Sequence, residues 1–195
     1  NRDAYMEANT TSGKDTLLKA IILGALIAGG VGILFILQSQ NRSLQAPVQP
    51  ASTVGGPAPE FTLPNLDQEM VSLSDFKGKV VLLNIWATWC PPCVEEMPSM
   101  QKLYQTLKGE GLEIVAVSID TDGAKAVAPF MEKHKLSFLA LTDTQGLMQR
   151  LYRPTGVPES HIIDRNGKVV DKVIGPRDWA SPDALRYFRD LLKAE

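Results

Sequence analysis

The sequence predicts an α/β domain in which helices cover both faces of a central mixed β-sheet. Two observations support this fold class. The runs 79–87 and 112–120 are almost continuously apolar and rich in β-branched residues, which is typical of strands that are buried on both faces. Strand and helix patterns also alternate along the chain, and a hairpin and a last helix follow them, as in layered α/β proteins.

The segment 20–37 contains no charged residue and predicts a single transmembrane helix. At about 1.5 Å per residue it would span roughly 27 Å, close to the thickness of the hydrocarbon core of a bilayer. Lys14 and Lys19 precede it, which favours a short cytoplasmic segment at 1–19 with the bulk of the chain on the other side. A cleaved signal peptide and a buried globular helix are the alternatives, and the apolar run is long for a signal peptide.

A linker and one folded domain are expected after this anchor. Residues 38–56 are rich in Pro, Ser, Gln and Gly, which predicts a flexible linker. Residues 57–195 are enough to build one hydrophobic core. The formal net charge is −2 and the basic residues are scattered, so nucleic acid is not an expected partner.

The first elements of the domain are two short strands and the buried strand at 79–87. Residues 60–66 and 69–76 alternate apolar and polar side chains, as a small N-terminal strand pair does. After the buried strand, apolar residues recur with helical spacing, so a helix is expected over 91–111. Pro98 lies within this helix and should kink it.

The remaining elements complete the sheet and its helical layers. We expect a strand over 112–120, a helix over 124–135, a strand over 137–143, a short helix over 146–154 and a hairpin over 159–175 that turns at residues 165–167. The last helix is expected to begin after Ser181, which can cap it, with Pro182 at its first position and Asp183 in its first turn.

The two cysteines of the chain, Cys90 and Cys93, are separated by two prolines. As a structural disulfide they would close a very short loop and add little stability. A zinc site needs about four ligands, and His134 and His161 are both distant in sequence. Attachment of c-type haem needs a histidine directly after the second cysteine, where Val94 stands. A redox pair is the interpretation that remains.

The position of the pair supports redox chemistry. Cys90 and Cys93 follow a buried strand at the point where a helix begins, and helix N-termini present free N–H groups and partial positive charge. Such a site stabilises a thiolate and increases the reactive fraction. We therefore expect Cys90, at the cap, to be exposed and nucleophilic, and Cys93, one turn further, to be partly buried. Pro91 and Pro92 should stiffen the first turn.

The stretch VVLLNIWATWCPPC, residues 80–93, resembles the active-site strand and turn of the thioredoxin superfamily. The stretch GVPES, residues 156–160, resembles the cis-proline loop of the same superfamily. This resemblance implies a thioredoxin-like fold for residues 57–195 and a cis bond between Val157 and Pro158, whereas the bond between residues 153 and 154 should be trans.

Other features narrow the resemblance to one group of the superfamily. Residues 121–145 add a helix and a strand that plain thioredoxin lacks. Together with the anchor and the N-terminal strand pair, this insertion is similar to the TlpA, ResA and CcmG group of bacterial membrane-tethered thiol reductases. Residues 175–185, GPRDWASPDAL, look most like the TlpA branch.

The resemblance implies that a carboxylate assists the cysteine pair. Asn84 stands where thioredoxin has a buried aspartate, and an amide cannot take a proton. The ResA-like group has a glutamate at the position of Glu96, one helical turn after Cys93. Glu96 is therefore expected to accept the proton of Cys93. The alternative is a solvated glutamate in the first turn of the helix.

The resemblance also implies where a partner protein docks. Backbone groups at Val157 and Pro158 would pair with an extended strand of the partner opposite Cys90. Trp89 and Pro91, on either side of Cys90, would contribute to the same substrate-binding surface.

The function implied by the resemblance is that of a protein thiol:disulfide oxidoreductase in the bacterial inner membrane, with its catalytic domain in the periplasm. The enzyme would reduce disulfides in apocytochrome c or in proteins that assemble the copper sites of cytochrome oxidase. A membrane thiol transporter of the DsbD or CcdA type would restore its electrons. No metal or organic cofactor is implied.

Two alternative functions have weaker support in the residues. A thiol-based copper chaperone would hold the metal through the two cysteines and a distant histidine, for which His161 is the candidate. A peroxiredoxin-like peroxidase would carry the pattern Pro-x-x-x-Thr-x-x-Cys. That pattern needs proline at position 83 and threonine at position 87, where Leu83 and Ala87 stand.

Overall fold

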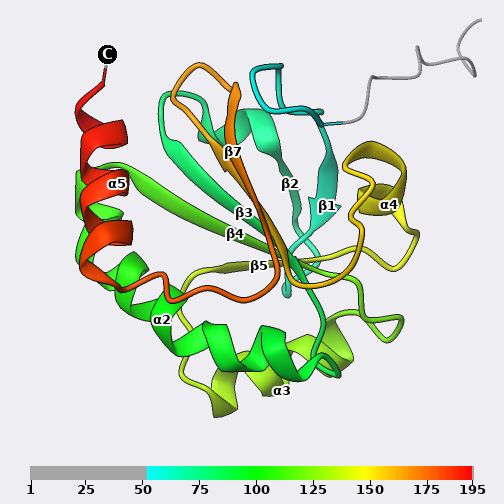
Figure 1. The fold of residues 1–195 in the computed structure, drawn as a ribbon. Helices are drawn as coiled ribbons and strands as arrows, with labels where there is room; N and C mark the ends of the chain where they lie inside the picture. Colours follow the sequence, from blue (N-terminus) through cyan, green and yellow to red (C-terminus); the bar gives the residue numbers. More distant parts are fainter. Residues whose placement is uncertain (1–51, 195) are drawn as a thin grey trace, which may run out of the picture. The chain divides into compact units, whose positions relative to one another are not determined.

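The computed structural model describes residues 52–194 (Figure 1). The predicted cytoplasmic segment 1–19, the predicted transmembrane helix 20–37 and most of the predicted linker 38–56 lie outside the described residues. Among residues 52–194, no helix combines the length and the apolar character that a membrane crossing requires.

The domain is built on a mixed sheet, as predicted from the alternating elements. The sheet has five strands in the order β5-β4-β3-β6-β7. The central strand, β3 (Val80–Trp86), pairs in parallel with β4 (Leu112–Ser118) and antiparallel with β6 (Glu159–Ile163). The edges are β5 (Leu139–Thr142), parallel to β4, and β7 (Val169–Ile174), antiparallel to β6 (Figure 1).

The central place of β3 follows from its composition. All of its residues are buried, and successive side chains point to opposite faces of the sheet. Val80, Leu82 and Trp86 belong to the hydrophobic core on one face, and Val81, Leu83 and Ile85 to the core on the other. A strand without a polar face can only be accommodated between two layers.

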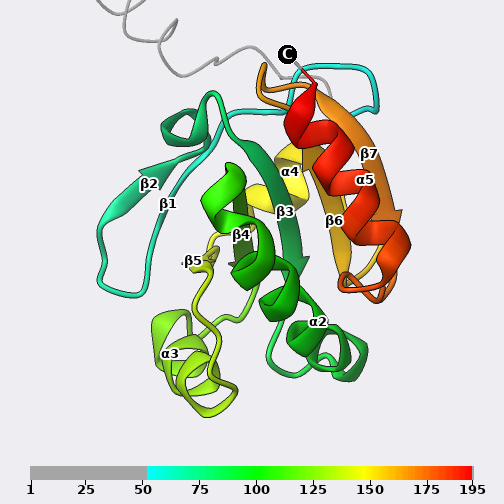
Figure 2. The same ribbon diagram turned by 90° about the vertical axis from the view of Figure 1, so that its left-hand side faces the viewer.

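Different elements pack against the two faces of the sheet. The first face packs against α2 (Pro91–Leu107), α3 (Ala124–Lys133) and α5 (Pro182–Lys193), which contribute buried residues to the same core as Leu82. Figure 2 shows α2 and α5 in front of this face. The second face is covered by α4 (Leu147–Leu151) and by the N-terminal strand pair.

The N-terminal strand pair forms as predicted but is shorter. Strand β1 (Thr62–Pro64) pairs antiparallel with β2 (Met70–Ser72). The expected second strand, 69–76, was wrong in its last part, because Leu73–Phe76 forms a 3₁₀ helix, η1. Ser72 and Asp75 make a capping box there, with Asp75 Oδ2 accepting from Ser72 N at 2.8 Å. Side chains of this kind compete with the pairing of a strand.

The helix boundaries agree with the cap residues in the sequence. α2 is followed by a 3₁₀ turn, η2 (Lys108–Glu110), and the chain leaves it at Gly111 with φ of 104°, a conformation that glycine adopts without strain. Ser181 caps α5, since its Oγ accepts from Ala184 N at 3.2 Å. Pro98 lies inside α2, and the kink expected there stays a prediction.

The last residues of the predicted linker pack onto the domain. Ser52 N donates to Leu151 O at 3.3 Å, and Gly55 N donates to Val169 O at 2.8 Å. Val169 N donates in turn to Gly56 O at 2.9 Å. The hydrogen-bonded chain therefore extends upstream of residue 57, where the domain was expected to begin.

Candidate active site

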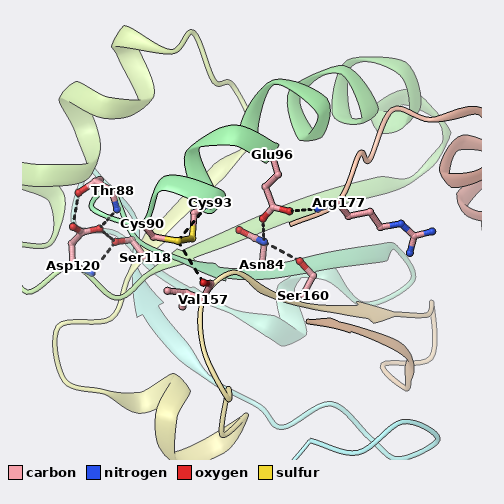
Figure 3. The surroundings of a disulfide bond; sticks show 10 residues. All are labelled: Asn84, Thr88, Cys90, Cys93, Glu96, Ser118, Asp120, Val157, Ser160 and Arg177. Carbon is pink, nitrogen blue, oxygen red and sulfur yellow. Dashed lines mark hydrogen bonds between the residues drawn. A yellow bond between two sulfur atoms is a disulfide. The ribbon is translucent and has the colours of Figure 1, made fainter. Parts of the chain in front are cut away.

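The two cysteines lie at the junction of β3 and α2. Cys90 is the N-cap residue of α2 and Cys93 lies in its first turn, with Pro91 at the first helical position. The pair forms a disulfide with its Cα atoms 5.3 Å apart (Figure 3). Cys93 N donates to Cys90 Sγ at 3.3 Å, so the sulfur takes the place that a capping oxygen occupies in other helices. The partial positive charge at this helix end favours a thiolate once the bond is reduced.

Cys90 is less accessible than the sequence suggested. We expected it to be exposed, but in the disulfide form only 4% of its surface is accessible, and the predicted partly buried Cys93 is fully buried. The reason is that a loop far along the chain covers the sulfur: Cys90 Sγ lies 3.5 Å from the carbonyl oxygen of Val157. The two neighbours of Cys90 in the sequence are accessible: Pro91 is exposed, and Trp89 has 64% of its surface accessible.

The loop that covers Cys90 contains the predicted cis proline. The Val157–Pro158 bond is the one cis peptide bond among residues 52–194, so the bond between residues 153 and 154 is trans, as expected. Pro158 O accepts from Gly175 N at 2.9 Å, which ties this loop to the end of β7. Val157 is half-buried. Pro158 is buried and directly precedes β6 in the chain.

Glu96 is a buried carboxylate and not the solvated residue that was the alternative. Only 3% of it is accessible. Its Oε1 accepts from Asn84 Nδ2 at 2.9 Å, and its Oε2 accepts from Trp179 Nε1 at 2.9 Å and from Arg177 N at 3.2 Å. Burial raises the pKa of Glu96, and these three hydrogen bonds, that from Trp179 first, oppose the increase. The structure thus places a buried carboxyl group with a raised pKa on the same helix as Cys93, one turn further along.

Asn84 lies at the base of this arrangement on β3. Its Nδ2 also donates to Ser160 Oγ on the neighbouring strand β6 at 2.9 Å. Its Oδ1 has no hydrogen-bond partner within the described part of the chain. The amide therefore orients Glu96 from the sheet side and keeps one acceptor free.

Two contacts of Glu96 were not predicted from the sequence. Trp179 is buried and Arg177 is half-buried, and both lie in the segment between β7 and α5. They are separated from Glu96 by about eighty residues. The spacing of neighbouring residues cannot predict a contact over such a distance in sequence. The resemblance also implied no role for Trp179.

A second network that the sequence did not reveal holds the turn before Cys90. Asp120, two residues after the end of β4, accepts from Thr88 N at 2.9 Å and from Thr88 Oγ1 at 2.6 Å (Figure 3). Ser118 Oγ donates to the same carboxylate at 2.6 Å. Asp120 is buried, so this carboxylate fixes the turn that carries Trp89 and Cys90. Asp120 fell inside the strand expected over 112–120, so the sequence carried no signal of this role.

His161 is a core histidine, and it does not join the cysteines. It is fully buried with Tyr152 at the face of the sheet opposite to α2, where its Nε2 lies 3.1 Å from Glu159 Oε1. Its Nδ1 lies 3.1 Å from Ser52 Oγ. Burial lowers the pKa of His161, and Glu159 opposes this effect. His161 therefore does not lie with the cysteines as the third ligand that the chaperone hypothesis named. Among residues 52–194, no cluster of three or more His, Cys, Asp or Glu side chains could hold a metal ion.

Comparison with known proteins agrees with this geometry. Residues 54–172 match the model of the AhpC/TSA family. The thiol-disulfide oxidoreductase ResA of Bacillus cereus is 36% identical over 162 residues, which are 83% of this chain and 90% of the relative. ResA of Oceanobacillus iheyensis is 43% identical over 127 residues, 63% of this chain and 65% of the relative. A solved structure described as a putative thiol:disulfide interchange protein DsbE from Chlorobium tepidum is 34% identical, covers 73% of this chain and 96% of its own, and superposes with a TM-score of 0.63.

The match to the family model extends over more than half of the chain, and the similarity to ResA includes the strand, the turn and the helix that present Cys90 and Cys93. The disulfide stands at the N-terminus of α2, where the partial positive charge of a helix end favours a reactive thiolate. This chain therefore belongs to the AhpC/TSA family of thioredoxin-like proteins and is a thiol-disulfide oxidoreductase.

Proposed function

We propose that the enzyme acts as a reductase of partner proteins in the periplasm, held at the bacterial inner membrane by residues 20–37. The observation that carries the catalytic part is the Cys90–Cys93 disulfide at the N-terminus of α2, in contact with the carbonyl of Val157. The apolar segment before the domain supports the location.

The reaction consists of two thiol–disulfide exchanges. In the reduced enzyme, the Cys90 thiolate attacks one sulfur of the partner's disulfide, and the other sulfur leaves as a thiolate. Cys93 then loses its proton to Glu96 and attacks Cys90 Sγ, which releases the second sulfur of the partner. Two electrons pass to the partner, and the enzyme returns to the Cys90–Cys93 disulfide that the structure contains.

The partner binds as an extended strand beside the cis-proline loop. The backbone of Val157 faces Cys90, and an added strand there would place the partner's cysteine against the Cys90 sulfur. Exposed Trp89 and Pro91 supply apolar surface on the other side of the same sulfur. These contacts use backbone and apolar groups, which suits an enzyme with more than one protein substrate.

Trapping identifies the partner. With Cys93→Ser in the full chain, Cys90 forms mixed disulfides that cannot resolve, and mass spectrometry of the host's membrane and periplasmic fractions names the captured proteins. The matched control is the double variant Cys90→Ser/Cys93→Ser. We expect cytochrome c precursors or copper-site assembly proteins. If no protein is captured by Cys93→Ser that is absent from the double variant, the protein-reductase proposal is wrong.

The direction of electron flow has its own test. Equilibration of the enzyme with glutathione redox buffers gives its reduction potential, which for a reductant must lie well below that of DsbA, about −120 mV. A value near that of DsbA would make the enzyme an oxidant. Loss of the reduced form in cells that lack a membrane thiol transporter of the DsbD or CcdA type would identify the source of electrons.

The location is tested with the full chain. The protein should sediment with the membranes, and deletion of residues 20–37 should release it. In spheroplasts, an added protease should degrade the domain if it faces the periplasm. Protection of the domain until the membrane is broken would contradict the proposed orientation.

A further inference from the structure

The segment between β7 and α5 makes two of the three hydrogen bonds to Glu96. Trp179 Nε1 and Arg177 N both donate to Oε2, at 2.9 Å and 3.2 Å, and Asn84 serves the other oxygen. All three partners are N–H donors. An arrangement of donors alone is complementary to an ionised carboxylate, because a protonated carboxyl also needs an acceptor.

Ser99 of α2 holds this segment in place. Its Oγ lies 2.8 Å from Glu96 O and 3.3 Å from Arg177 O, and it accepts from Trp179 N at 3.0 Å. The indole of Trp179 packs against the ring of Phe188 on α5, with 6.2 Å between the ring centroids. Ser99 therefore holds the backbone of Trp179 on α2, and Phe188 of α5 packs against its indole.

The same segment borders the place where Glu96 approaches solvent. A surface pocket is lined by residues of α2 and of this segment, namely Glu95, Glu96, Pro98, Ser99, Pro176, Arg177 and Asp178. Arg177 also extends its guanidinium over the Trp179 ring, 5.5 Å from the centroid. A proton that Glu96 takes from Cys93 has to leave before the next cycle, and because Glu96 lines this pocket, the pocket gives that proton a route to solvent.

We propose that Trp179 is a positioning residue for the thiol-disulfide exchange, which fixes the ionised carboxylate of Glu96, one helical turn from Cys93, through its indole N–H. The inference rests on the role of Glu96 in the proposed function. According to this inference, the segment 176–179 keeps the Glu96 carboxylate ionised, so that it can accept a proton. Without this hydrogen bond the buried carboxylate is harder to ionise, so the pKa of Glu96 should increase further.

The test uses two buried tryptophans of the same protein. Trp179→Phe removes the N–H donor and keeps most of the ring. Trp86→Phe is the matched control, since Trp86 is equally buried and its Nε1 has no hydrogen-bond partner among residues 52–194. Thermal unfolding of both variants shows whether each is folded.

The experiment measures the rate at which Cys93 attacks the mixed disulfide formed at Cys90. The reduced enzyme reacts with Ellman's reagent in two phases: Cys90 attack releases one thionitrobenzoate, and Cys93 attack on the mixed disulfide releases the second. We expect the midpoint of the second phase in its pH profile to move upward by about one pH unit in Trp179→Phe, the effect of losing one hydrogen bond to a charged group. Trp86→Phe should keep the profile of the wild type.

The double variant Glu96→Gln/Trp179→Phe separates the two proposals. If Trp179 acts through Glu96, the double variant has the same profile as Glu96→Gln. A further change in the double variant, or an unchanged profile in Trp179→Phe, overturns the inference about Trp179. An unchanged profile in Glu96→Gln overturns the role of Glu96 in the proposed function.

A second readout does not depend on the reaction. The indole N–H signal of Trp179 in an NMR spectrum of the full chain should move with pH as Glu96 titrates, and this movement should be absent in Glu96→Gln. If the signal does not respond to pH in the wild type, Trp179 does not hold the carboxylate, and the inference is wrong.

Discussion

At the scale of single residues, the site depends on the pair Asn84 and Glu96. The amide of Asn84 is bound through its N–H groups, to Glu96 and to Ser160, while its Oδ1 has no partner within residues 52–194. When Glu96 binds a proton it becomes a donor, and a rotated Asn84 amide would present Oδ1 as the acceptor. An asparagine can therefore serve both protonation states of the neighbouring carboxyl group without carrying a charge itself.

Glu96→Gln is expected to remove a pH-dependent part of the stability. Burial raises the pKa of Glu96 in the folded protein, so the folded state binds this proton more tightly than the unfolded state. The wild type should therefore lose stability as the pH rises through the folded pKa, by about 1.4 kcal/mol for each pH unit between the unfolded and the folded value. Urea unfolding of both proteins between roughly pH 4 and pH 8 measures the difference. A difference that stays constant over this range would contradict the prediction.

Glu96 could be predicted from the sequence, whereas its partners could not, and the reason is distance along the chain. Cys93 and Glu96 are one helical turn apart, so a local pattern contains their relation. Trp179 lies next to Glu96 because the segment between β7 and α5 packs against α2, where Ser99 Oγ accepts from Trp179 N. Burial of the carboxylate is likewise a tertiary effect, and the spacing alone left a solvated glutamate as an alternative.

At the scale of elements, the site is made where strand ends, a helix start and a loop meet. The end of β3 leads into α2 through the turn that contains Thr88, and the end of β4 supplies Asp120 to hold that turn. Parallel pairing of β3 and β4 brings these two ends to the same edge of the sheet. The turn before Cys90 is therefore positioned by a neighbouring strand and not by its own sequence.

Asp120→Ala is expected to loosen the turn before Cys90. The change leaves Thr88 N and two hydroxyl groups without their buried acceptor, which should lower the free energy of unfolding by about 2 to 3 kcal/mol. The first phase of the reaction with Ellman's reagent, which reports on Cys90, should slow as well. Exposed Asp122 is the control, and Asp122→Ala should change neither quantity. Equal stability of the two variants would show that the turn holds without Asp120.

Ser181→Ala is expected to weaken α5 and, through it, the segment that carries Trp179. The change removes the acceptor of Ala184 N and should cost about 1 kcal/mol, measured by urea unfolding. Ser181→Asp keeps an acceptor at the cap and is the matched control. If both variants have the stability of the wild type, the cap hydrogen bond contributes nothing measurable to the domain.

At the scale of the whole molecule, the sheet and its layers could be predicted because their determinants are continuous apolar runs. β3 and β4 are buried on both faces, and such strands take the centre of the sheet in any arrangement that covers them. The 3₁₀ turn Leu73–Phe76 was missed because alternating polarity describes a strand and a short capped turn equally well. Residues 52–56 were assigned to the linker because they contain few apolar groups, yet they pair through backbone atoms, which composition does not reveal.

A chain that begins at residue 57 is expected to be less stable than one that begins at residue 50. The shorter chain lacks the backbone hydrogen bonds that join Ser52 to Leu151 and the segment Gly55–Gly56 to Val169. It also lacks the contact of Ser52 Oγ with His161 Nδ1, which leaves a buried ring nitrogen without that partner. At about 1 kcal/mol for each hydrogen bond, the loss should amount to roughly 2 to 4 kcal/mol in urea unfolding of the oxidised proteins. Ser52→Ala in the longer chain isolates the contact with His161. Identical stability of the two chains would mean that these residues lie against the domain without contributing to it, and the boundary at residue 57 would then stand.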